Sequence, residues 1–170
     1  MPRTAREELS REVGGALRIY HGTVEAIDNA ACAYMGINRT DLRCLDILGR
    51  AGPMTAGRLA DESKLTNAAI TIVVDRLERI GYVRRVRDTT DRRRVVVDAT
   101  TKAHRRAWTL YGKVADKLNE QLDRYPDHEL ALLRDFLRER TEVDAEIAAE
   151  FTKRRPLHPK GSRRERTSRA

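Results

Sequence analysis

Arginine side chains are concentrated in one short stretch, residues 75–94, which holds eight arginines and four acidic residues. Guanidinium groups bind phosphate oxygens and pair bidentately with guanine. Just before this stretch lies Asn67, whose amide can pair bidentately with adenine, among small and apolar side chains that can contact the methyl group of thymine. These residue types predict a surface that binds double-stranded DNA.

A helix is expected to carry the first part of this surface. Apolar residues recur at helical spacing from residue 70 to residue 80, which places them on one face of a helix. Thr66 is expected to cap its start, and Gly81 is the residue type that ends a helix in a left-handed conformation. The candidates for contacting bases lie mainly on the other faces, and they are Asn67, Ala68, Thr71, Ile72 and Arg76.

A β-hairpin is expected to follow this helix. Residues 82–87 and 94–97 are short, β-branched or arginine-rich segments, and residues 88–91, which lie between them, favour a turn. Upstream, Thr55 is expected to cap a short helix that leads through a tight turn to Thr66. Two helices joined in this way and followed by a hairpin with an arginine-rich tip are the outline of a winged helix-turn-helix.

Each part of this unit has a predicted role on DNA. Thr55 and Thr66 would offer their helix N-termini to phosphates. At the hairpin tip, at least one of the three arginines would enter a narrow minor groove, where the potential is most negative. These are Arg92, Arg93 and Arg94. Arg84 and Arg87 would meet phosphates, and Asp91 would brace an arginine and hold the turn.

Plainer alternatives remain open for the same residues. Arg76 could pair with Asp75 or another carboxylate of its own chain and contact no base. The tip arginines could be exposed in a loop without a fixed conformation. The basic stretch and an acidic stretch at residues 127–150 could be ordinary solvated faces.

Long amphipathic helices are expected on both sides of this unit. Their predicted ranges are 6–35, about 100–125 and 127–151, and Thr40 is expected to cap a shorter helix after the first of them. Their apolar stripes exceed what a small winged unit can cover, which predicts a homodimer. The fold is therefore predicted to be mainly α, with a DNA-binding region at 40–99 and a dimerisation region at 6–38 and 101–151.

Composition and the absence of known motifs argue against several other classes of protein. The four histidines are scattered, and the sequence contains no nucleophile elbow and no glycine-rich phosphate loop, so neither an enzyme nor a metal or cofactor site is expected. No signal peptide or membrane span is apparent, which favours a cytoplasmic protein. Residues 152–170 are basic and poor in apolar side chains, so this tail is predicted to be disordered.

The wing sequence resembles the MarR family of bacterial transcriptional regulators. The matching motifs are Asp75-Arg76-Leu77, Gly81-Tyr82-Val83, Asp88 and Asp91-Arg92-Arg93. Ala99 and Ala103 depart from the usual leucine and glycine, and Ile72 stands where the family often has a polar or basic residue. The resemblance implies a homodimer that binds a pseudo-palindromic operator and usually represses neighbouring genes. It also implies release by a small phenolic or aromatic effector or by cysteine oxidation.

An effector pocket would lie where the first, second and fifth helices meet. Polar and aromatic side chains expected near it are Arg18, Tyr20, His21, Cys44, Trp108 and Tyr111. The alternative is that Trp108 and Tyr111 belong to the core. Cys32 and Cys44 lack an adjacent base or a C-x-x-C spacing, so inert buried thiols are favoured over redox sensors.

Two other functions fit parts of the sequence. The basic tail alone could make the chain a coating protein that binds nucleic acid without regard to sequence. Alternatively, the winged helix could dock a protein partner in place of DNA. Binding by a chain truncated after the last helix tests the first alternative, and charge reversal at Arg92 and Arg93 tests the second.

Overall fold

The structure is a computed structural model, and it describes residues 4–88, 91 and 93–153 of the 170-residue chain. The described helices and strands follow the chain in the order α1 (Ala5–Met35), α2 (Arg39–Ala51), α3 (Ala56–Ser63), α4 (Asn67–Arg79), β1 (Val83–Arg87), β2 (Val95–Ala99), α5 (Thr101–Leu122) and α6 (Asp127–Lys153). They confirm the predicted mainly α fold with a winged helix. The described residues up to Lys117 form one compact unit, and the described residues from Leu118 to Lys153 form another.

The helix starts follow from local capping. Thr55 and Thr66 cap α3 and α4 as predicted, because their hydroxyl oxygens accept hydrogen bonds from the main-chain N–H groups of Arg58 and Ala69 at 3.3 and 3.2 Å. The expected cap at Thr40 was wrong. Asn38 caps α2 instead, because its side chain accepts from Asp41 N at 2.9 Å while Asp41 Oδ2 accepts from Asn38 N at 3.2 Å.

Gly81 ends the turn after α4 in the left-handed region, with φ of +77°, as its residue type predicted. The chain then enters an antiparallel hairpin in which Val83 pairs with Ala99 and Arg87 with Val95. Asp91 holds the hairpin turn, since its Oδ1 accepts from Arg93 N at 3.0 Å and its carbonyl oxygen accepts from Arg94 N at 2.9 Å. The described part of the wing therefore has a defined backbone conformation.

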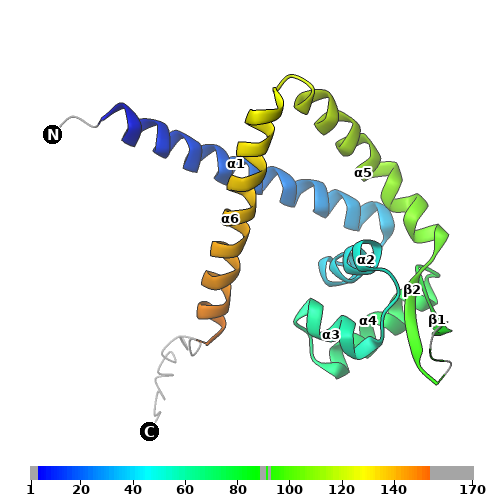
Figure 1. Ribbon diagram of the computed structural model, residues 1–170. Coiled ribbons are helices and arrows are strands. Elements are labelled where there is room, and N and C mark those ends of the chain that lie inside the picture. Colours follow the sequence, from blue (N-terminus) through cyan, green and yellow to red (C-terminus); the bar gives the residue numbers. More distant parts are fainter. Residues whose placement is uncertain (1–3, 89–90, 92, 154–170) are drawn as a thin grey trace, which may run out of the picture. The chain divides into compact units, whose positions relative to one another are not determined.

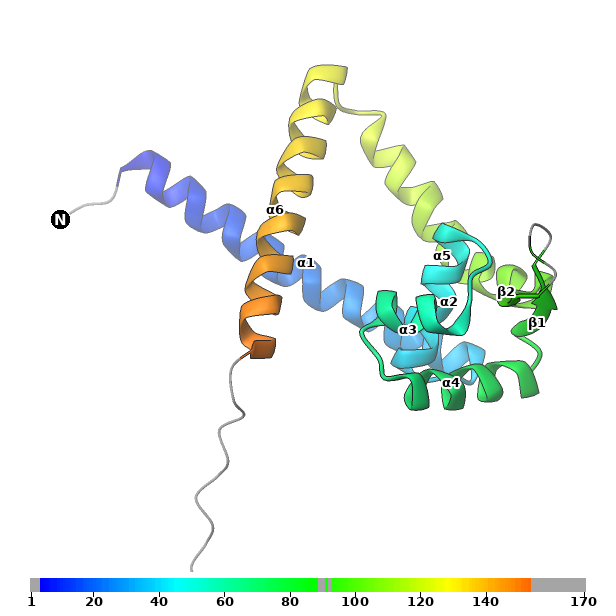
Figure 2. The same ribbon diagram turned by 60° about the horizontal axis from the view of Figure 1, so that its bottom comes forward.

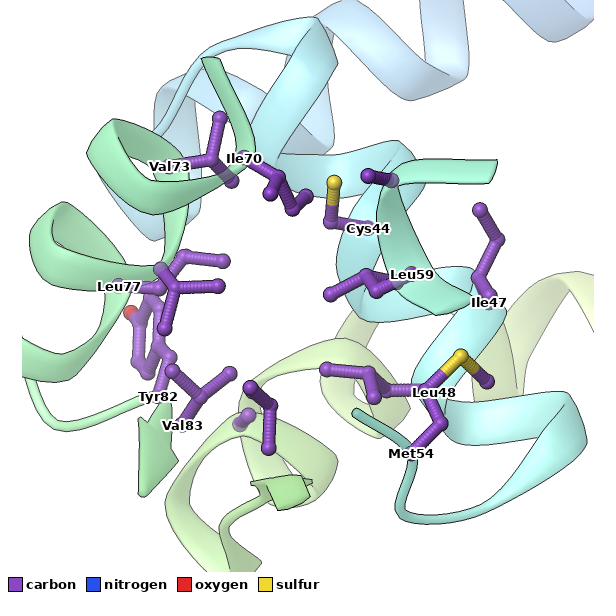
Figure 3. Close-up of a cluster of buried hydrophobic side chains, with 14 of the residues drawn as sticks. Cys44, Ile47, Leu48, Met54, Leu59, Ile70, Val73, Leu77, Tyr82 and Val83 are labelled. Carbon is purple, nitrogen blue, oxygen red and sulfur yellow. The ribbon is translucent and has the colours of Figure 1, made fainter. Parts of the chain in front are cut away.

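One hydrophobic core holds α2, α3, α4 and the hairpin together, and Figures 1 and 2 show these elements gathered at one end of the first unit. Figure 3 shows Leu48, Leu59 and Met54 facing Leu77 and Val83 across this core. Leu59 and Leu77 are fully buried. Tyr82 adds a tie to α1, because its hydroxyl donates to the carbonyl oxygen of Met35 at 3.0 Å. The apolar stripe predicted for α4 is thus its core face.

The long helices leave apolar side chains uncovered. Large apolar residues that are exposed on α1, α5 and α6 include Leu9, Val13, Ile19, Val114, Leu118, Leu132, Leu133, Phe136, Leu137, Val143, Ile147 and Phe151. The fifth helix ends at Leu122, three residues before the predicted end, and α6 begins at Asp127 as predicted after Pro126. Within the described ranges, none of these helices combines the length and hydropathy that crossing a bilayer requires.

Candidate nucleic-acid interface

The N-terminal half of α4 presents a solvent-exposed face on the side opposite the core. Asn67, Ala68, Thr71 and Ile72 are all exposed, and the side chain of Ile72 is 62% exposed although it is fully apolar. Ile70, Val73 and Val74 are buried in the core beside them. The helical spacing therefore separated the two faces correctly, and four of the five predicted base-contacting residues lie together on the exposed one.

Arg76, the fifth candidate, forms an ion pair within its own chain. Its Nε lies 2.9 Å from Oδ2 of Asp41 and its Nη2 lies 2.5 Å from Oδ1, in a bidentate arrangement with a carboxylate that is fully buried. Hydrogen bonding to this carboxylate raises the pKa of Arg76. The pairing with an intrachain carboxylate was the open alternative, although the partner lies in α2 and is not Asp75. This pairing weighs against a base contact by Arg76.

The C-terminal half of α4 is tied to the wing by Arg85, a residue for which the sequence predicted no role. Its Nη2 lies 2.5 Å from Oδ1 of Asp75, and its other terminal nitrogen pairs with Glu78. Its main-chain N–H also donates to Glu78 Oε1 at 3.0 Å. These contacts fix α4 against β1. They also neutralise two of the four acidic residues in the arginine-rich stretch.

The wing arginines fall into two groups. Arg84 pairs with Asp98 directly across the hairpin, with Nη2 2.7 Å from Oδ2. Arg87, Arg93 and Arg94 are exposed, and no carboxylate among the described residues pairs with their side chains. Arg92 lies outside the described residues. The wing thus carries unneutralised cations at Arg87, for which a phosphate contact was predicted, and toward its tip, where entry into a minor groove was predicted.

The end of α4 is held by residues at the start of α5. Thr100 Oγ1 donates to the carbonyl oxygen of Gly81 at 2.8 Å, and Lys102 Nζ donates to that of Ile80 at 2.6 Å. A cation at a helix C-terminus also opposes the partial negative charge there. Together with the Asp41–Arg76 pair, these bonds hold the C-terminal end of α4 against α2 and the start of α5. The hydrogen bonds of Thr100 and Lys102 were not predicted, because they join residues 19 and 22 positions apart in the sequence.

A cavity of about 930 Å³ lies between α1, α2 and α5 within the first unit. Trp108 and Tyr111 line it as predicted, together with three arginines and a histidine. The basic lining residues are Arg39, Arg43, Arg50 and His104. Trp108 is 70% exposed, so the alternative that it belongs to the core was wrong. Its indole lies over Gly112, where an added Cβ would meet it at 3.1 Å.

Four of the six residues predicted for this cavity do not line it. Cys44 is fully buried and faces the core in Figure 3. Arg18, Tyr20 and His21 lie on α1 at least seven residues before Asp28, the first lining residue, which is roughly 10 Å along a helix. The sequence placed these side chains on the right helix but could not locate the cavity along it.

Tyr111 belongs to a hydrogen-bonded chain that joins α5, α1 and α2. Its hydroxyl donates to Asp28 Oδ1 at 2.8 Å, and Asp28 Oδ2 lies 2.7 Å from Nη1 of Arg39. Burial, and then the hydrogen bond to Asp28, raises the pKa of Tyr111. The half-buried tyrosine is therefore a structural tie at the cavity wall as well as a lining residue.

Tyr111→Phe is expected to lower the free energy of unfolding by about 1 kcal/mol at pH 7, because it removes a hydrogen bond to a carboxylate. Wild-type stability should also fall as the pH rises above about 10, since the unfolded tyrosine loses its proton before the folded one does. This alkaline loss should be smaller in the variant. Urea unfolding at pH 7 and 10.5 measures both effects, with the exposed Tyr20→Phe as control. Equal losses of stability in Tyr111→Phe and Tyr20→Phe would contradict the assignment of Tyr111 as a structural tie.

The two cysteines are free and buried, on α1 and α2. Burial raises the pKa of both thiols, for Cys44 despite a hydrogen bond with Ser63 that acts in the opposite direction. In the native protein at pH 8, both should react with an aromatic disulfide reagent at least tenfold more slowly than after unfolding in guanidinium, because little thiolate is present and access is blocked. Release of the coloured thiol measures the rate, and Cys32→Ser and Cys44→Ser assign it. A fast native reaction would support a redox sensor.

Comparison with known proteins agrees with this geometry. A model of the MarR family matches residues 37–95, which run from the start of α2 into the wing. The chain is 35% identical to the uncharacterised HTH-type transcriptional regulator YcgE of Bacillus subtilis over 135 residues, which cover 79% of this chain and 88% of the relative.

Solved structures share the fold. A MarR family protein from Bacillus stearothermophilus superposes with a TM-score of 0.62 at 24% identity, over 82% of this chain and 97% of the other. RV1404 from Mycobacterium tuberculosis superposes with a TM-score of 0.58 at 20% identity, over 85% and 97%. With an exposed recognition helix and an arginine-bearing wing built on this fold, the chain belongs to the MarR family of DNA-binding transcriptional regulators.

Proposed function

We propose that the chain is a homodimeric repressor that binds a pseudo-palindromic operator through α4 and the wing. The observation that carries the proposal is the presence of an exposed α4 face and of unneutralised arginines at Arg87, Arg93 and Arg94 on the same compact unit. A helix in the major groove and a basic finger over the flanking backbone would both engage one half-site. The helix N-termini at Thr55 and Thr66 would add phosphate contacts.

The dimer is supported by the exposed apolar residues of α1, α5 and α6. A single soluble chain rarely leaves so many large apolar side chains in water, and MarR regulators act as dimers. In this proposal residues 6–38 and 101–151 make the dimerisation region, residues 40–99 the DNA-binding region, and 152–170 a basic tail. Light scattering of the full chain should give twice the mass of 19.4 kDa.

The effector site of this proposal is the cavity between α1, α2 and α5. Trp108 and Tyr111 supply aromatic surface, while Arg43 supplies a charge that would hold a carboxylate or phenolate. The cavity contacts α2, which in turn holds α4 through the Asp41–Arg76 pair. A ligand that shifts α2 would therefore change the direction of the recognition helix.

Selection of DNA from a random duplex library by the full chain, followed by footprinting, tests the proposal. The expected result is enrichment of a two-fold symmetric sequence with protection over roughly two helical turns. A chain ending at Lys153 should keep this preference. Enrichment of no sequence, or loss of all binding in the shortened chain, would indicate a coating protein that binds through its basic tail. Transcription from a template carrying the selected site should fall when the protein is added.

A further inference from the structure

We propose that α4 recognises its site chiefly through the 5-methyl groups of thymines in the major groove, which Ile72, Ala68 and Thr71 contact. The inference rests on the proposed function, because it assumes that α4 enters a major groove. It goes further by naming the chemical group that is read. Two features of α4 support the inference: its charged side chains that could contact base edges are already paired, and its exposed face presents methyl groups.

The charged side chains of α4 that could contact base edges already have partners. Arg76, the residue best suited to pair with guanine, donates both Nε and Nη2 to the buried carboxylate of Asp41. Asp75, which could accept from the amino group of cytosine, pairs with Arg85 at 2.5 Å. Using either group on a base would break an ion pair that fixes the helix in place. Direct reading of G·C pairs by these two residues is therefore disfavoured.

Thr71 presents its methyl group. Its hydroxyl donates to the carbonyl oxygen of Asn67, one helical turn earlier, at 2.9 Å. The hydroxyl hydrogen is thus engaged within the helix and is not available to a base acceptor such as N7 or O6. What remains directed outward from this exposed residue is the γ-methyl group and an oxygen that can only accept.

Ile72 and Ala68 lie next to Thr71 on the exposed face. They are four residues apart, so their side chains are neighbours on the helix surface. Ile72 is 62% exposed and lies outside the core cluster that buries Ile70 and Val73. The exposed side chain of Ile72 offers this face an apolar contact, and the methyl group of thymine is the apolar feature that the major groove offers.

Other polar groups flank this apolar surface without replacing it. Asn67 is exposed at the first turn and can pair with adenine, the partner of thymine. Arg79 is exposed at the last residue of α4, seven residues from Ile72 and so roughly 10 Å along the helix. Recognition helices contact bases mainly through their N-terminal residues, which places Arg79 beside the backbone. The expected half-site is accordingly rich in A·T pairs.

Uracil differs from thymine only by the missing methyl group, so it tests the proposal directly. The probe is a duplex that the full chain has selected from the random library, together with copies in which deoxyuridine replaces thymidine at single protected positions. Each contacted methyl should be worth about a fourfold change in affinity, the equivalent of burying one CH₂ group. Uracil outside the protected positions should change nothing.

Variants of the protein supply the matching half of the experiment. Ile72→Ala should bind the thymine duplex more weakly and should lose its sensitivity to uracil at one or more positions. Thr71→Val keeps the methyl and removes the hydroxyl, so it should bind within about twofold of wild type. Thr71→Ser keeps the hydroxyl and removes the methyl, so it should bind several-fold more weakly. All three sites are exposed, and urea unfolding should show stabilities close to wild type.

The outcomes separate this inference from the function on which it rests. Enrichment of a specific sequence together with equal wild-type affinity for thymine and uracil duplexes would overturn the methyl contact and leave the regulator intact. So would a loss of binding in Thr71→Val with none in Thr71→Ser. Failure to enrich any sequence would overturn the proposed function and the inference together.

Discussion

Replacing Arg76 by alanine is expected to lower the free energy of unfolding by about 3 kcal/mol or more, because it leaves the buried carboxylate of Asp41 without its counterion. This carboxylate has no exposed surface, and the guanidinium supplies it with short bonds from Nε and Nη2. Asp41 N–H and one of its oxygens also serve the Asn38 cap. Replacing Arg76 rather than Asp41 therefore removes the ion pair but leaves the Asn38 cap in place.

Urea unfolding followed by circular dichroism at fixed protein concentration measures this effect, since the stability of the proposed dimer would depend on concentration. Arg79→Ala is the matched control. Arg79 lies on the same helix three residues later, is exposed, and has no side-chain partner among the described residues. Its loss should change stability by less than about 0.5 kcal/mol. Equal losses in the two variants would show that the buried pair contributes nothing beyond helix propensity.

Joint replacement of Arg93 and Arg94 by glutamate is expected to weaken binding to a selected duplex roughly 100-fold or more at low salt. Both side chains are exposed on the wing beside the turn that Asp91 holds. The charge reversal converts attraction to phosphates into repulsion in each copy of the proposed dimer. The slope of log affinity against log salt should also become shallower, by about one for each phosphate that the variant no longer binds.

The matched control for the wing variant is the replacement of two arginines by glutamate outside the wing. Arg11 on α1 and Arg105 on α5 are exposed and have no side-chain partner among the described residues. Glutamate at both positions alters net charge identically and should cost far less affinity. Both positions lie in the proposed dimerisation region, so light scattering of this variant should give the same mass as wild type. Fluorescence anisotropy across a salt series measures both proteins. Unchanged affinity in the wing variant would favour a winged helix that docks a protein partner.

Periodic and local signals predicted most of the winged unit. The apolar stripe at residues 70–80 marked the core face of α4, and Thr55 and Thr66 capped their helices as their residue types indicate. Gly81 and the turn at residue 91 bounded the hairpin. These signals succeed because each depends on residues within a few positions of one another, where spacing alone determines the geometry.

One local signal was misjudged. Asn38 and Thr40 are both good capping residues, and the reciprocal bond from Asp41 decides for Asn38, a spacing that the sequence did display.

Contacts between distant residues were beyond the same reasoning. The partner of Arg76 lies 35 positions earlier, and only the packing of α2 against α4 brings the two together. Position along α1 likewise decided which predicted residues reach the cavity. The contacts of Arg93 and Arg94 with DNA stay predictions.

The indole that lies over Gly112 gives the protein a built-in optical reporter. Trp108 is the single tryptophan of the sequence, so the whole tryptophan emission arises from one point on the wall of the cavity. Because that ring is largely in contact with water, an aromatic molecule that stacks on it would change the intensity and wavelength of the emission. Candidate effectors can therefore be titrated against the unlabelled protein, in the presence or absence of DNA.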